Sequence, residues 1–135
     1  MTDRPRLPPP WRDVLLEEPF RLFFPIGVIA TLAGVAPWLL YYAGMQSGYS
    51  GYDHGLVQIQ AFEMAFATGF LMTAVPRFLE VHGTRMWELI LGLALCAAAS
   101  AALILHRVVV GEALFLALSV HLTVFCLRRL RGRGD

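Results

Sequence analysis

The chain has 135 residues, of which 57% are hydrophobic and only 16% are charged, and its mean hydropathy is +0.59. A soluble domain carries about 25% charged residues, so the composition excludes an ordinary soluble domain and indicates an integral membrane protein. The formal net charge of +1 hides an uneven distribution, because all eleven basic residues are arginine. With so few charges and such short loops, nucleic-acid binding has no support.

The predicted elements follow one another as apolar spans separated by short polar segments. Residues 1–21 are a polar, proline-containing lead-in, in which Trp11 anchors a short helix at the membrane interface. An apolar stretch of about 20 residues crosses ~30 Å of hydrocarbon. On this basis spans are predicted at 22–44, 55–76, 86–105 and 108–127, followed by an Arg-rich tail at 128–135. The expected fold is an all-α membrane bundle of four transmembrane helices.

The arginines predict the orientation of this bundle. With four spans, both termini and the middle loop share one side, and that side carries ten of the eleven arginines, leaving only Arg107 on the other. Because cytoplasmic loops are enriched in arginine, both termini are expected in the cytoplasm. The arginine-only composition suggests a bacterial source, so the predicted location is a bacterial inner membrane. His54 and His106 then lie near the outer face.

Polar residues inside the predicted spans are the main functional candidates. The second span opens with His54-Gly55 and carries a lone glutamate, Glu63, near its middle. A carboxyl group at membrane depth is costly and is by default a functional hypothesis. Two alternatives stay open: Glu63 acts on a proton or ligand, or it is a buried carboxyl that is hydrogen-bonded to a neighbour such as Gln60. His121, in the fourth span, is a third buried polar candidate, with the same structural alternative.

The depth of each residue limits which of them can share a ligand. Glu63 comes nine residues after His54, which places it ~13 Å deeper at ~1.5 Å per residue. His121 lies deeper still from the outer face, whereas His106 lies at the same interface as His54. If a haem is bound, we expect His54 and His106 to be its axial pair, because haem iron readily takes imidazole. Two alternatives stay open: His54 pairs with a ligand from a neighbouring subunit, or both histidines are interfacial and bind no ligand.

Two stretches carry a resemblance to a known family. The run from Glu18 to Gly27 and the helix from His54 to Leu79, most closely over residues 69–76, resemble the NnrS family. Those proteins are membrane proteins linked to the nitric-oxide response, and they carry haem and copper. The resemblance therefore implies haem b as a cofactor and copper as a second candidate, with His54 as the candidate metal ligand.

The second helix departs from the family pattern. Many NnrS proteins carry His-x-His-Glu-Met there, whereas this chain has Gln60, Phe62, Glu63 and Met64 at those positions. The same helix distantly resembles the His-Gly-initiated helix of haem–copper oxidases, in which twelve helices form three four-helix arcs. A four-helix chain similar to one arc predicts a homotrimer that rebuilds the ring, since self-association favours closed cyclic symmetry.

The sequence thus predicts a haem-binding inner-membrane protein of NnrS type that serves the nitric-oxide response or electron transfer. The competing prediction is a cofactor-free accessory or assembly subunit of a larger respiratory membrane complex. A proton or solute conduit around Glu63 ranks lower, because no second buried carboxylate or broken helix pair accompanies it. No catalytic constellation in the sequence identifies an enzyme.

Overall fold

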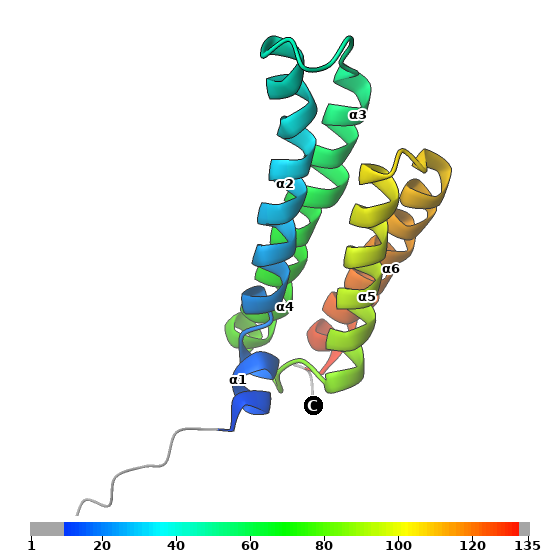
Figure 1. The fold of residues 1–135 in the computed structure, drawn as a ribbon. Helices are drawn as coiled ribbons and strands as arrows, with labels where there is room; N and C mark the ends of the chain where they lie inside the picture. The colour runs from blue at the N-terminus through cyan, green and yellow to red at the C-terminus, as the bar shows by residue number, and fades with distance from the viewer. Residues whose placement is uncertain (1–9, 133–135) are drawn as a thin grey trace, which may run out of the picture.

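A computed structural model describes residues 10–132, so the predictions for residues 1–9 and 133–135 lie outside the described part. The elements, in chain order, are α1 (Trp11–Glu17), α2 (Phe20–Tyr42), α3 (Gly51–Leu56), the π-helix η1 (Val57–Glu63), α4 (Met64–Leu79), α5 (Met86–Ile104) and α6 (Val108–Arg131). The segments α3, η1 and α4 follow one another without a break. Figure 1 shows two antiparallel helical hairpins side by side: α2 with α3–η1–α4, and α5 with α6.

Four helical segments are long and apolar enough to cross a membrane, namely Phe20–Tyr42, Gly51–Leu79, Met86–Ile104 and Val108–Arg131. The predicted all-α, four-span fold is confirmed. The bounds differ most at two places. The second span begins at Gly51, ahead of the predicted residue 55, because the Ser50 hydroxyl accepts a hydrogen bond from the Asp53 backbone and caps the helix (3.2 Å). The fourth span continues through Arg131, into the predicted tail.

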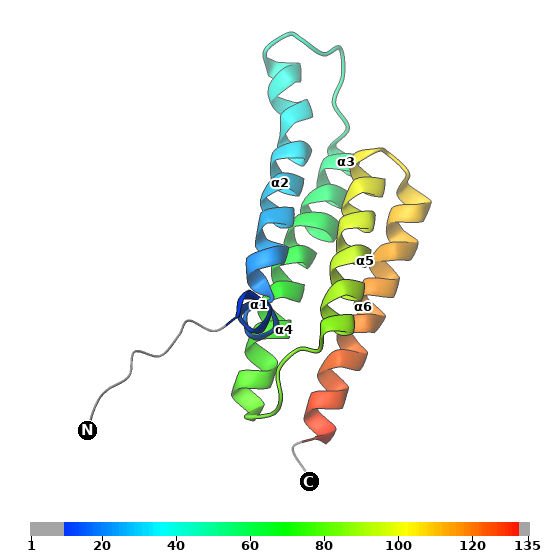
Figure 2. The same ribbon diagram turned by 60° about the horizontal axis from the view of Figure 1, so that its bottom comes forward.

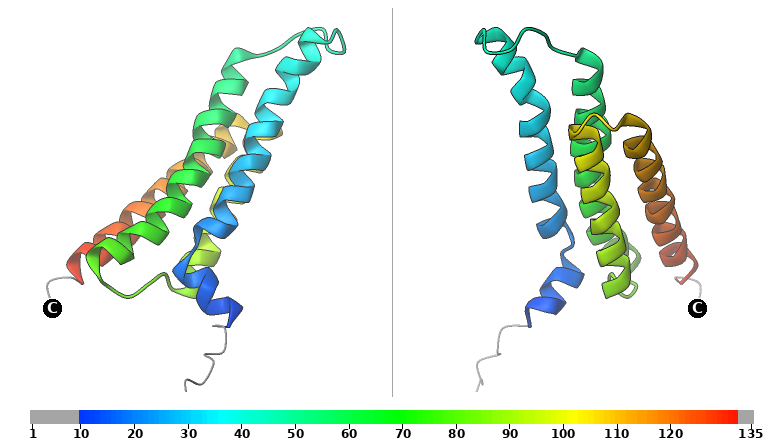
Figure 3. Two further views of the ribbon diagram at one scale, coloured as in Figure 1. Left: turned by 90° about the vertical axis from the view of Figure 1, so that its left-hand side faces the viewer. Right: turned by 45° about the vertical axis from the view of Figure 1, so that its right-hand side comes forward.

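The two hairpins meet along an apolar core. Its larger part is a cluster centred on Phe23, Met72, Leu118 and Phe125. A smaller cluster includes Ala30 in the middle of α2, Ala61 of η1, and Leu103 near the C-terminal end of α5. Figures 2 and 3 show that α2 and the loop after it extend beyond the turn between α5 and α6. The core therefore holds the four spans together and leaves the helix ends to position polar groups.

A buried ion pair joins α5 to α6 at the end of the bundle that also holds α1, which we call the arginine end. The Arg129 guanidinium lies 2.6 Å and 2.8 Å from the two carboxylate oxygens of Glu88, and both side chains are about fully buried. Arg129 also donates to the Gly83 carbonyl (3.0 Å), and its guanidinium lies 4.2 Å from the Phe125 ring centroid. Because a buried charge is tolerated only when paired and hydrogen-bonded, this pairing keeps α6 helical beyond the predicted end at residue 127.

Removing one partner of this pair should be strongly destabilising. In Arg129→Leu the Glu88 carboxylate is left buried and unpaired, which costs about 3–5 kcal/mol, so the midpoint of thermal unfolding in detergent should fall. Arg131→Ala, an exposed arginine on the same helix end, is the matched control and should leave the midpoint unchanged. The double variant Glu88→Leu/Arg129→Leu should recover most of the loss. Equal midpoints for Arg129→Leu and Arg131→Ala would refute the role of the pair.

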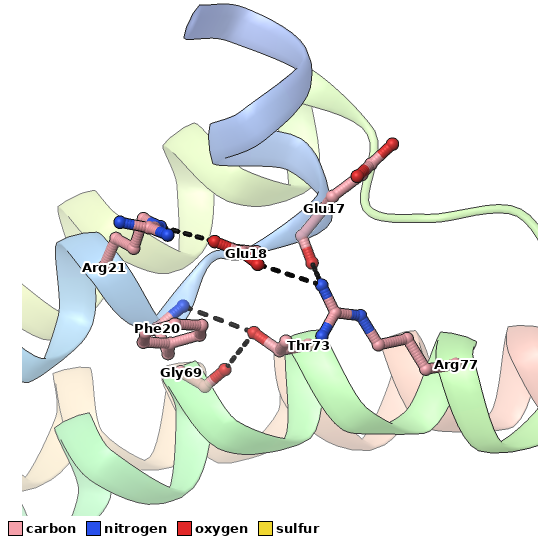
Figure 4. Close-up of polar contacts among 7 residues, drawn as sticks. All are labelled: Glu17, Glu18, Phe20, Arg21, Gly69, Thr73 and Arg77. Carbon is pink, nitrogen blue, oxygen red and sulfur yellow. Dashed lines mark hydrogen bonds and ion pairs between the residues drawn. The ribbon is translucent and has the colours of Figure 1, made fainter. Parts of the chain in front are cut away.

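A second polar cluster, shown in Figure 4, holds α1, α2 and α4 together at the same end. Glu18, in the bend between α1 and α2, pairs with Arg21 and lies 3.3 Å from Arg77 of α4. The Phe20 backbone N–H donates to the Thr73 hydroxyl (3.3 Å), which itself donates to the Gly69 carbonyl (2.8 Å). The hydrogen bond from Arg21, and then that from Arg77, hold the pKa of Glu18 below its ordinary value of 4.5.

The lowered pKa of Glu18 makes this cluster sensitive to acid. A carboxyl whose pKa is lower in the folded state contributes stability above its unfolded pKa and loses it as pH falls through the folded value. The wild type should therefore unfold at a higher temperature than Glu18→Gln at pH 7, and this difference should vanish as the pH falls well below 4.5. Glu17→Gln, whose carboxylate points away from Arg77 in Figure 4, should match the wild type at pH 7. A difference that persists at low pH would contradict the assignment.

Candidate functional site

A cavity of about 380 Å³ opens at the other end of the bundle, which we call the histidine end. The end of α2, the loop at residues 43–50, α3 and the turn between α5 and α6 all contribute to its wall. Its lining includes Gly34, Tyr49, Asp53, His54 and His106. The two histidines that the sequence predicts as a pair therefore line the same cavity, although they come from different hairpins.

His54 is oriented by the backbone of α2. Its Nδ1 lies 2.9 Å from the Gly34 carbonyl oxygen. Because a carbonyl can only accept, Nδ1 carries a hydrogen, and in the neutral ring Nε2 then keeps its lone pair. Among the described residues the His54 ring makes no other hydrogen bond. A histidine that donates one ring N–H to a carbonyl and leaves the other nitrogen unprotonated has the arrangement typical of metal-ligating histidines.

A side-chain pair one turn further along fixes this part of the second span against α2. The Thr31 hydroxyl donates to the Gln58 side-chain oxygen (2.6 Å), and the Gln58 amide donates back to the Thr31 carbonyl (3.2 Å). Gly34 allows the two helices to approach, since a Cβ at this position would lie 2.8 Å from Gln58 Nε2 and 2.9 Å from Val57 Cγ1. The position of His54 thus depends on a close helix–helix contact.

His106 closes the cavity from the second hairpin. Its Nδ1 lies 3.2 Å from a carboxylate oxygen of Asp53, and its side chain is 69% exposed. The residue has a positive φ of 57°, and the Arg107 backbone N–H donates to the Ala102 carbonyl (2.8 Å), which is the Schellman ending that usually places glycine there. A histidine in the left-handed region is uncommon, and here that conformation accompanies the contact with Asp53.

The other predicted site residues lie away from this cavity. Glu63, expected to be buried, is exposed on the surface of the described chain, because Ala61 and Ala65 face the core and each is two positions away, about 200° around the helix. The side-chain oxygen of Gln60 is buried and has no hydrogen-bond partner among the described residues. His121 lies near the arginine end, where its Nε2 donates to the Glu88 carbonyl on α5 (3.1 Å).

The donor set at the histidine end consists of two imidazoles that line one cavity. Two imidazoles with their Nδ1 atoms engaged match the ligands that haem iron accepts. Among residues 10–132, however, no group of three or more histidine, cysteine, aspartate or glutamate side chains is placed to hold a metal ion.

Sequence reasoning missed the groups that hold these side chains in place. Asp53 was not considered, although it is adjacent to His54 and lies in the first helical turn. Glu88 was also missed, and Arg129 was assigned to the tail. The sequence holds a weak signal for this pair, since a carboxylate just inside the third span lies at the same end of the bundle as the arginines that end the fourth.

Together the fold and the cavity define a multi-pass, all-α membrane protein with two oriented imidazoles at one end of its bundle. A family model described as NnrS protein matches residues 14–133. The chain therefore belongs to the NnrS family, as the sequence resemblance predicts, and the match runs through the third and fourth spans as well. No curated protein matches the chain, and no solved structure matches it.

The close contact at Gly34 predicts that alanine substitution there is more destabilising than at Gly55, a second helical glycine. Gly34→Ala should push the second span away from α2, because the new Cβ has less than 3.0 Å to its neighbours, and overpacking of this kind costs about 1–3 kcal/mol. Gly55→Ala, where nothing lies within 4 Å, should be neutral or slightly stabilising, since alanine favours a helix. Thermal unfolding in detergent measures both. A harmless Gly34→Ala would show that the contact does not position His54.

Proposed function

We propose that this NnrS family member is a haem-binding membrane protein of the nitric-oxide response, with His54 and His106 as the haem ligands. Membership of the family supports a nitric-oxide-response type of membrane protein. The observation that carries the haem assignment is that both imidazoles line one cavity while an oxygen acceptor engages each Nδ1. This arrangement leaves the two Nε2 atoms as the available ligand nitrogens.

The residues around the cavity have distinct tasks in this proposal. The Gly34 carbonyl and the Asp53 carboxylate orient the two rings and make them better ligands, as second-shell acceptors do. Val57 and Leu103, both buried, form an apolar wall of the cavity and exclude water from it. A bound haem held by both imidazoles would supply an iron centre that exchanges an electron.

The proposal extends to location and assembly. The arginine count favours a bacterial inner membrane with the histidine end facing outward, so the cavity would be open to the periplasmic side. We also propose self-association of the chain as a homotrimer. The exposed carboxyl of Glu63 within a span supports a protein partner there, since such groups rarely face lipid.

The absorption spectrum of the purified protein, oxidised and reduced, is the decisive experiment. We expect a Soret band, a b-type pyridine haemochrome and no stoichiometric copper, with the haem lost in His54→Ala because its ligand nitrogen is removed. His82→Ala is the matched control, since His82 is exposed in the loop at the arginine end, and it should keep the full spectrum.

Two results would overturn the haem assignment. A colourless preparation would favour the competing function, a cofactor-free accessory or assembly subunit of a larger respiratory complex, and co-purification of that complex would establish it. A haem spectrum that survives both His54→Ala and His106→Ala would place the haem elsewhere on the protein.

A further inference from the structure

We infer that a second copy of this chain packs against one exposed face of the second span. The face consists of Ile59, Glu63, Ala67 and Phe70, all exposed, and we call it the Glu63 face. Their spacing places them within about 80° of one another on a helix of ~100° per residue. This inference names the contact surface of the self-association proposed above and rests on that part of the proposed function, not on haem.

The position of Glu63 along the span places its carboxyl group deep in the membrane. Glu63 comes twelve residues after Gly51 and sixteen before Leu79 in a helical segment of 29 residues. At ~1.5 Å per residue it lies ~18 Å from one end and ~24 Å from the other. The hydrocarbon core is ~30 Å thick, so neither end of the helix brings this carboxyl near water.

Nothing in the described part of the chain satisfies this carboxyl group. Glu63 forms no hydrogen bond with Gln58, which is engaged with Thr31, and the oxygen of its neighbour Gln60 also has no donor. A carboxyl group near the centre of a membrane helix is costly unless a protein group satisfies it. The Glu63 face therefore favours protein over lipid.

The chemistry of the face favours another copy of the same chain as its occupant. A carboxylic acid offers both an O–H donor and a carbonyl acceptor, so Glu63 residues brought together by a symmetry axis complement one another. Ala67 is small enough for two helices to approach closely. Other exposed polar groups in the spans are already satisfied, as Thr123 is by the Ser119 carbonyl (2.8 Å), or lie near a helix end, as Glu112 does.

Cysteine cross-linking in membranes tests which face is covered. In a Cys96→Ala/Cys126→Ala background, Ala67→Cys should form covalent multimers with a short thiol cross-linker. The matched control is Ala97→Cys on α5, an equally small and exposed residue in the middle of a span, and it should remain monomeric on a denaturing gel. Equal cross-linking at both positions, or cross-linking at Ala97→Cys alone, overturns the assignment of the face.

Substitution of Glu63 itself tests the chemistry. Because Glu63 forms no hydrogen bond within the described chain, Glu63→Leu should leave the midpoint of thermal unfolding of the single chain unchanged. Its self-association in mild detergent, measured by sedimentation, should weaken roughly 5- to 30-fold, as expected for the loss of a 1–2 kcal/mol interhelical hydrogen bond. Glu63→Gln keeps donor and acceptor and should associate like the wild type.

The outcomes separate this inference from the haem assignment. Unweakened association of Glu63→Leu overturns the inference and leaves the haem assignment unaffected. A monomeric wild-type protein overturns both the inference and the homo-oligomer, while the haem assignment still stands or falls on the spectrum and His54→Ala. Cross-linking at Ala67→Cys with a colourless protein supports the inference and refutes the haem assignment.

Discussion

The buried ion pair between Glu88 and Arg129 is the interaction on which the arrangement of the second hairpin depends. It fastens α5 to α6 and, through the Gly83 carbonyl, to the loop that leads from the first hairpin. In lipid no water replaces a lost hydrogen-bond partner. Moving any of the three segments would therefore leave a buried polar group without a partner, and this fixes their relative positions. From this fixed end the two helices run to the turn that presents His106, and the position of that side chain opposite Asp53 follows from their length and packing.

The two ends of the bundle use their polar groups differently. At the arginine end several side chains are held within the chain: Arg129 holds Glu88 and Gly83, although its Nε has no acceptor among the described residues, His121 holds the Glu88 carbonyl, and Arg77 holds Glu18. At the histidine end, each of the two rings uses its Nδ1 for one supporting contact, and both residues line the same cavity. A satisfied network gives rigidity, whereas imidazole nitrogens that the fold supports but leaves available are the groups a ligand can use. The fold thus separates structural from binding chemistry by about the length of a span.

Hydropathy predicted the four spans, and residue counting along them placed His54 and His106 at one end, because both depend only on length. The rotation of each helix about its axis could not be obtained in the same way. It decides that Glu63 faces outward, that Gln58 meets Thr31 rather than Glu63, and that Arg129 turns inward while Arg131 does not. The π-helix at Val57–Glu63 shifts the phase of the second span in the middle of the very segment on which these contacts depend.

The second span therefore presents different chemistry on different sides. His54 faces the cavity formed with the other hairpin, whereas Glu63, nine residues later at the end of the π-helix, is exposed on the outside of the bundle. The intervening η1 segment packs on α2 through Gln58 and Ala61, so a partner pressing on the Glu63 face pushes this segment toward α2. That force acts along the contact at Gly34, whose carbonyl orients His54. If copies of the chain associate through the Glu63 face as proposed, that contact and the geometry of the histidine end are coupled through one helix.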